Sequence, residues 1–230
     1  MQRTVPSCLR SLASILSAVC AVAVVSPTAQ ESAIVSGRVE IGIPIASRRP
    51  SAAYTSRAIA APTLAPESER RNVVVYRRDA PAQAVSPIQV AIRQEHERFL
   101  PRVVAVTVGS DVEFPNDDPI YHNVFSLSRV GTFNLGRYPR GETRSVRFDE
   151  PGVVKVFCDI HSHMSATVMI FDHPWFVVPD EAGRFALPAM PEGNQQITAW
   201  HARLGDTTVD IRVESGQTNA ADFVLPVPEE

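Results

Sequence analysis

The chain has 230 residues, which is enough for about one or two domains of the usual size. Hydrophobic residues make up 44% of it and charged residues 20%, so a packed core is expected and wholesale disorder is excluded. The formal net charge of −3 excludes the basic surplus with which proteins bind nucleic acid.

The first 29 residues have the features of a secretory signal. The run 12–25 is apolar apart from two serines and is shorter than the roughly 20 residues that span a membrane. This predicts cleavage after Ala29 and export to the periplasm, with no transmembrane segment in the mature chain. A lipid anchor on Cys20 is the less favoured alternative, because Val19 is a poor match to the small residue that precedes such a cysteine.

Short strand-like segments make up most of the remaining chain. Segments 34–43 and 72–77 flank a stretch, 46–71, that is rich in Ser, Ala, Arg and Pro and is expected to be a flexible loop. Segment 88–99 is compatible with a helix or with strands. From residue 102 onward, β-branched and aromatic runs alternate with turns and predict an all-β chain, with strands at 103–108, 112–114, 124–127, 143–148, 153–157, 166–171, 175–178, 184–187, 196–200, 208–213 and 219–225.

Removal of the signal would leave Cys158 as the only cysteine of the exported chain. It would then have no partner for an internal disulfide in an oxidising compartment. A bound metal would occupy this thiol, because the thiolate is the form that ligates metals.

The residues around Cys158 support a metal site. Its segment reads Cys158-Asp-Ile-His161-Ser-His-Met164 and follows a predicted strand, while His122 lies upstream. One thiolate, two imidazoles and a thioether are the donors of a copper electron-transfer site, with a trigonal plane and a long axial bond from Met. Each residue alone is more often a core or polar residue than a ligand. In this order and spacing, they predict one mononuclear copper.

Two nearby residues compete for ligand roles. His163 follows His161 by two positions, so both rings would share one face of an extended segment. Met169 is a second thioether, but it lies inside an apolar strand and is expected to pack in the core. Three further histidines lie in no such cluster and are expected to be ordinary polar or surface residues: His96, His173 and His201.

These motifs resemble the cupredoxins, and most of all the amicyanin-type members. The ligand loop has the short Cys-x-x-His-x-x-Met spacing of amicyanin rather than the longer plastocyanin spacing. The segment His122-Asn-Val matches as well, as do Phe114-Pro-Asn-Asp-Asp118 ahead of it and the lead-in Phe148-x-x-Pro-Gly before the cysteine. The resemblance covers residues 86–172.

The cupredoxin resemblance implies a Greek-key β-sandwich and a type 1 copper site. It implies that Asn123 fixes the ligand loop through hydrogen bonds, which is a contact of the kind that tunes a metal. It also assigns four copper ligands: His122, Cys158, His161 and Met164.

The two ends of the exported chain carry a second resemblance, on shorter motifs. The turn Asp180-x-x-Gly183-x-Phe185 and the Pro-x-Gly turn that ends at Gly193 are similar to those of carboxypeptidase regulatory-like, prealbumin-type sandwiches. Gly37-Arg-Val39 fits the opening strand of that pattern. This implies a second small β-sandwich built from 34–80 and 173–230, with the cupredoxin part inserted. A separate C-terminal module is the alternative.

The predicted function is one-electron transfer in the periplasm, with a redox partner protein as donor or acceptor. The alternative is a copper-binding or envelope interaction module without redox cycling. An enzyme is not expected, because four protein ligands leave no open position for a substrate.

Overall fold

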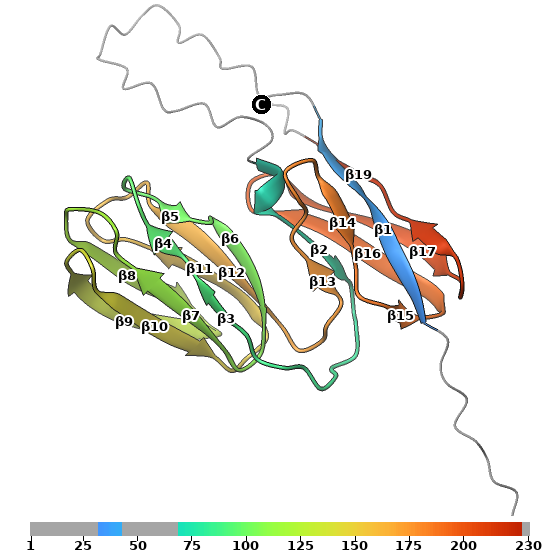
Figure 1. Ribbon diagram of the computed structural model, residues 1–230, viewed down its shortest axis with the longest axis horizontal. Helices are drawn as coiled ribbons and strands as arrows, with labels where there is room; N and C mark the ends of the chain where they lie inside the picture. Colours follow the sequence, from blue (N-terminus) through green and yellow to red (C-terminus); the bar gives the residue numbers. More distant parts are fainter. Residues whose placement is uncertain (1–31, 43–68, 227–230) are drawn as a thin grey trace, which may run out of the picture. The chain divides into compact units, whose positions relative to one another are not determined.

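The computed structural model describes residues 32–42 and 69–226 (Figure 1). The predicted signal and residues 46–68 of the predicted loop lie outside these ranges. The end of that loop forms the short 3-10 helix η1 (Arg70–Asn72), and every other regular element of the described residues is a strand. The predicted all-β fold class is confirmed. None of the described helices is long and apolar enough to cross a membrane.

The middle of the chain forms a sandwich of two sheets. One sheet has five strands in the order β6-β12-β11-β8-β9, and the other has three in the order β10-β7-β3. The strands of the larger sheet are β6 (Val103–Thr107), β8 (His122–Ser128), β9 (Gly131–Tyr138), β11 (Gly152–Phe157) and β12 (Ser165–Phe171). Those of the smaller sheet are β3 (Gln89–Ala91), β7 (Ser110–Pro115) and β10 (Thr143–Phe148).

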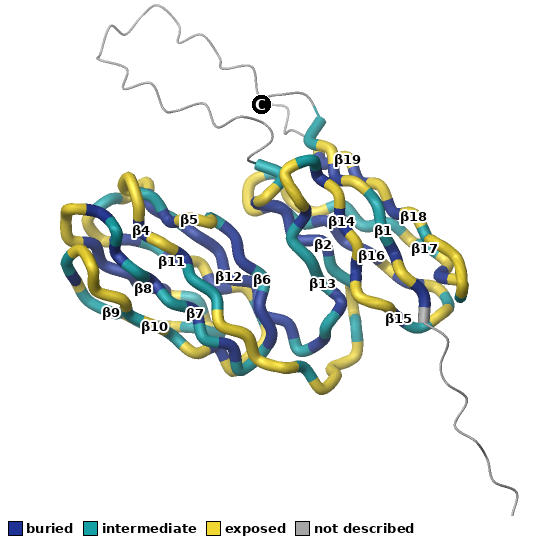
Figure 2. Tube along the Cα trace, viewed as in Figure 1, coloured by how far each residue is buried: buried dark blue, intermediate teal, exposed yellow. Residues whose placement is uncertain are grey.

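The alternation of side chains along the strands explains how this sandwich closes. In β7 every second residue is buried, so Val112 and Phe114 point inward while their neighbours are partly exposed. They meet Val124 of β8 and Val156 of β11 in one core. Complete burial of a side chain such as Phe114 contributes about 1.5–3 kcal/mol. Figure 2 colours buried residues dark blue; in contrast to β7, strand β12 is buried at every position from Ala166 to Phe171.

Segment 88–99, which was compatible with a helix, forms strands instead. Residues 89–91 pair in parallel with β7, and two short strands follow, β4 (Arg93–Gln94) and β5 (Phe99–Leu100), which form a hairpin. Gln94 is fully buried, and its amide donates to the hydroxyl of Tyr138 at 2.7 Å. The polar anchor and the pairing with β7 outweigh the local helix propensity, so the helical alternative is wrong.

A second pair of sheets contains the strands at the two ends of the described chain. Strand β1 (Ser32–Ile41) is the hub of a five-stranded sheet, and β2 (Val73–Arg77) lies inside a four-stranded one. The partners of β1 are β14 (Arg184–Ala186), β15 (Met190–Pro191), β18 (Thr218–Ala220) and β19 (Phe223–Leu225). The sheet of β2 also holds β13 (Phe176–Val177), β16 (Gly193–His201) and β17 (Gly205–Val213).

Two glycines explain the motifs of this second pair of sheets. A Cβ on Gly37 would lie 2.1 Å from the carbonyl oxygen of Ala221, so β1 and its neighbour approach too closely for any side chain. Gly183 has φ +80°, and a Cβ there would lie 2.2 Å from the carbonyl oxygen of Val39. The shape of this turn therefore depends on glycine at position 183.

Candidate metal centre

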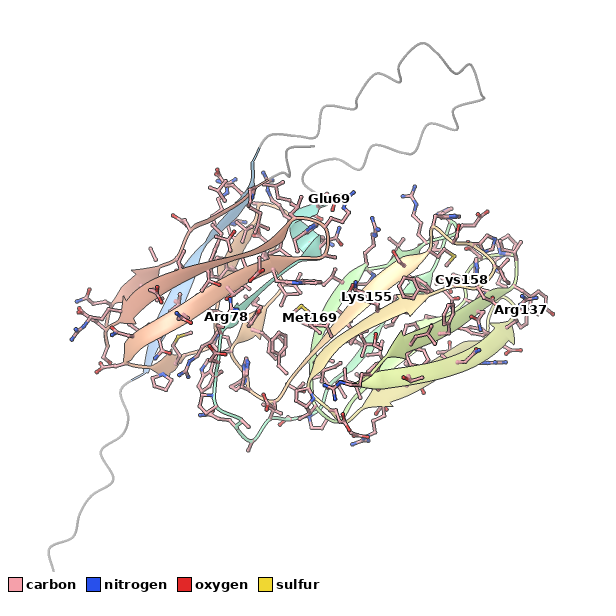
Figure 3. The ribbon with its side chains drawn as sticks, turned by 180° about the vertical axis from the view of Figure 1, so that it is seen from behind. Glu69, Arg78, Arg137, Lys155, Cys158 and Met169 are labelled. Atoms are coloured by element: carbon pink, nitrogen blue, oxygen red, sulfur yellow. The ribbon has the colours of Figure 1, made fainter. Side chains whose placement is uncertain are left out.

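The ends of three strands of the larger sheet converge on one loop. Strand β11 ends at Phe157, directly before Cys158, and β12 begins at Ser165, directly after Met164. His122 is the first residue of β8, and Phe125 of β8 pairs with Phe157. Figure 3 shows Cys158 at one end of these strands. The antiparallel pairing thus brings the loop and the start of β8 to the same end of the sandwich.

His122, Cys158 and His161 form a compact triangle of donor atoms. The Nδ1 atoms of the two histidines are 3.1 Å apart, and the sulfur of Cys158 lies 3.9 Å from each. The point equidistant from the three atoms lies in their plane at about 2.1 Å from each, which matches metal–nitrogen and metal–sulfur bonds of about 2.0–2.3 Å. Among the residues that the structure describes, this is the group of metal-binding side chains that lies close enough to share an ion.

The tautomer of His122 is set by Asp118. The Nε2 atom of His122 lies 2.7 Å from the carboxylate Oδ2 of Asp118, and a carboxylate can only accept. Nε2 therefore carries the ring proton, and Nδ1 presents a free lone pair to the triangle. Both side chains are buried, so this contact is shielded from water. A carboxylate behind an imidazole in this way orients the ring and makes it a stronger metal ligand.

Asp118 is held in its ionised form by its surroundings. Burial raises the pKa of its carboxyl, but the N–H groups of Glu97 and His96 and the ring of His122 together lower that pKa further, to below its usual value. The backbone N–H of Asp118 in turn donates to the side-chain oxygen of Asn116 at 3.0 Å. The carboxylate is therefore fixed in position before any metal arrives.

Met164 lies in the core cluster that also contains Cys158. Its side chain is 1% exposed, and its backbone N–H donates to the carbonyl of His161 at 3.0 Å, which tightens the loop into a turn. Met169 belongs to a different buried cluster, with Val103 and Phe171, and Figure 3 shows it well away from Cys158. Met164 therefore shares a buried cluster with Cys158, one residue of the triangle, whereas Met169 does not.

Of the two competing histidines, the structure brings His161 to the triangle and leaves His163 outside it. The ring of His163 is 60% exposed, and its Nε2 atom lies 3.7 Å from the carboxylate of Glu97. The ring centroids of His161 and His163 are 6.0 Å apart. The two rings are therefore not interchangeable in this conformation.

Asn123 differs from the expectation. Its side chain makes no hydrogen bond to the ligand loop, and its amide donates to Asn134 on β9 at 2.8 Å. Its Oδ1 atom is buried and has no partner among the described residues. The reason is a register shift between β8 and β9 just after Asn123, which directs this side chain along the neighbouring strand. The expected hydrogen bonds to the loop are wrong.

The other histidines take no part in the triangle. His201 is buried and its Nε2 lies 3.2 Å from a carboxylate oxygen of Glu69. The Nδ1 atom of His173 accepts the backbone N–H of Trp175 at 3.2 Å, and the side chain of His96 is exposed. These are ordinary polar roles, as expected.

Two residues that contact the histidines of the triangle were given no role from the sequence, Asp118 and Glu97. Asp118 lies within a matched motif and four residues before His122. In a loop, however, a spacing of four residues does not predict that two side chains are in contact. Glu97 lies within the ambiguous segment 88–99, so its position depended on the hairpin that the structure shows.

Comparison with known proteins gives similarity to solved structures over part of the chain. No family model and no curated protein matches it. A purple cupredoxin from Nitrosopumilus maritimus is 26% identical, with a TM-score of 0.32, over 36% of this chain and 98% of its own. Amicyanin from Paracoccus versutus is 24% identical, with a TM-score of 0.33, over 40% of this chain and 86% of its own.

A copper-containing nitrite reductase from Thermus scotoductus is 25% identical, with a TM-score of 0.35. That match covers 40% of this chain but only 24% of the nitrite reductase. Each of these three matches thus covers about two fifths of this chain.

Proposed function

We propose that this chain is a periplasmic blue-copper protein that transfers one electron through a mononuclear site. The triangle of two Nδ1 atoms and one sulfur supports this proposal most strongly, because its size fits a bound metal ion. His122, Cys158 and His161 would hold the metal, and Met164 would be the fourth ligand. Copper bound there would gain and lose a single electron, because soft sulfur favours Cu(I) and imidazole keeps Cu(II) acceptable.

The residues around the triangle would keep water out and hold one geometry. His122 is fully buried and Cys158 is 5% exposed, whereas the side chain of His161 is 19% exposed. His161 would therefore be the exit point for the electron. Three exposed apolar side chains lie next to the ligands in the sequence: Ile120 and Tyr121 before His122, and Ile160 before His161. They would offer a docking surface to a redox partner protein.

The second candidate is a copper-binding or envelope interaction module in which the metal does not cycle. Four protein donors around one metal leave no open position for a substrate, so we do not propose an enzyme. We also propose that 34–80 and 173–230 form one discontinuous domain, since β1 and β2 pair with strands that follow residue 173. Its part in either function would be structural or adhesive.

Titration of the purified protein with Cu(II) tests the proposed site. We expect an intense visible band, from charge transfer between thiolate and copper, that grows to one equivalent and then stops. A colourless complex at full loading, or uptake without a break at one equivalent, would contradict it.

Met164 should control the redox behaviour of the site. Replacing Met164 by Gln should leave the copper bound but lower its reduction potential, because a hard oxygen donor favours Cu(II). Met169→Leu is the matched control, since Met169 packs in a separate cluster, and it should leave potential and spectrum nearly unchanged. Voltammetry of both variants checks this, and a potential that moves only in the Met169 variant would show that the axial ligand is wrongly assigned.

A further inference from the structure

The hairpin of β4 and β5 has a two-residue turn with uncommon residues at its centre. The turn is closed by paired backbone hydrogen bonds between Glu95 and Arg98, at 3.0 and 3.1 Å. Its central residues, His96 and Glu97, have φ of +53° and +54°. Glycine adopts this left-handed conformation readily, and asparagine, aspartate and histidine are found in it more often than other residues, so Glu97 in particular must be stabilised there by its surroundings.

Asp118 provides that stabilisation. Its carboxylate accepts the backbone N–H of His96 at 2.6 Å and that of Glu97 at 2.8 Å. The oxygen that accepts from Glu97 is also the one that lies 2.7 Å from Nε2 of His122. One buried carboxylate therefore ties the turn to a residue of the donor triangle.

The turn also places the Glu97 side chain beside the other histidine of the triangle. A Glu97 carboxylate oxygen, Oε2, lies 3.9 Å from Nε2 of His161 and 3.7 Å from Nε2 of His163. These distances exceed those of direct hydrogen bonds, but they allow charge attraction or one bridging water. When Nδ1 of His161 binds a metal, its Nε2 carries the proton and points at this carboxylate.

We propose that the His96–Glu97 turn is a positioning element of the metal centre, which sets a carboxylate behind each of the two imidazoles. Asp118 serves His122, and Glu97 holds the ring of His161 with Nδ1 toward the metal. The hairpin contributes no ligand, yet it determines how strongly both rings bind. This inference rests on the proposed copper site.

Glu97→Gln tests the inference, with Glu95→Gln as the matched control. Both side chains are about half exposed on the same hairpin, but the Glu95 carboxylate faces His96, at 3.8 Å from its ring, rather than the triangle. We expect Glu97→Gln to weaken Cu(II) binding by about tenfold, at the low end of the range for such partners because Glu97 is half exposed. Glu95→Gln should change it less than about twofold.

Chelator competition gives the affinities, and voltammetry gives the potentials. The potential should rise in Glu97→Gln, since loss of a negative charge disfavours Cu(II) more than Cu(I), and stay unchanged in Glu95→Gln. Thermal unfolding of both metal-free variants should match the parent, which separates positioning from a structural role. Equal effects of the two variants on a blue parent protein would overturn this inference alone. A parent protein that binds no copper would overturn the proposed function and this inference with it.

Discussion

Replacing Cys158 by serine should abolish the visible charge-transfer band completely. The band requires a thiolate bonded to copper, because the easily oxidised electrons of sulfur make the charge-transfer energy low enough to fall in the visible; the harder serine oxygen holds its electrons more tightly and is not the soft donor that copper prefers. Because serine is close to cysteine in size, the fold should survive, at a cost of about 1–3 kcal/mol for placing a hydroxyl group in the core. Absorption and electron paramagnetic resonance spectra of the variant with one equivalent of Cu(II) measure the effect.

Ser162→Ala is the control for the Cys158 variant, since Ser162 lies in the same loop and is exposed. It should keep the band at full intensity. A blue Cys158→Ser protein would show that the thiolate is not a ligand. Loss of the band in both Cys158→Ser and Ser162→Ala would point to a general disturbance of the loop.

Replacing Asp118 by asparagine should weaken Cu(II) binding by roughly 10–100-fold, the usual effect of losing a carboxylate behind a ligand imidazole. Asp118 accepts three N–H groups with its two oxygens, whereas an amide has one oxygen. If the amide oxygen faces His122, the amide nitrogen faces the N–H of His96. In the reverse orientation the amide nitrogen faces Nε2 of His122, which favours the tautomer with the proton on Nδ1, the nitrogen that should bind the metal. Either arrangement leaves buried donors unpaired.

Asp117→Asn is the matched control for the Asp118 variant. The Asp117 carboxylate pairs at the surface with Arg93 at 2.8 Å and does not contact the triangle. Exposed pairs contribute about 0–1 kcal/mol, so metal affinity should stay near that of the parent. Chelator competition on both variants decides the matter, and equal affinities would mean that Asp118 has no influence on His122.

The sequence was sufficient to predict the parts that depend on local pattern. The spacing Cys158-x-x-His161-x-x-Met164 lies in a single loop, so it identifies three neighbours without knowledge of the fold. The alternation in β7 and the valine-rich β11 likewise predict strands, because burial of one face leaves a period of two residues in the sequence.

The parts that were missed depend on contacts between distant segments. Gln94 is 44 positions from Tyr138, so their buried hydrogen bond could not be predicted from the sequence. Local helix propensity was therefore the stronger signal for this segment. Asp118 meets the hairpin turn 21–22 positions upstream. The prediction for Asn123 was wrong for a related reason. The direction of its side chain follows a register shift between β8 and β9, which depends on strand pairing and not on the adjacent residues in the sequence.

A spectroelectrochemical titration of the copper-loaded protein tests the claim of one-electron transfer most directly. The claim predicts that the visible band bleaches and returns along one Nernst curve for a single electron, with the copper retained through repeated cycles. Loss of copper on reduction, or a band that does not return on reoxidation, would contradict it and favour a binding module without redox cycling.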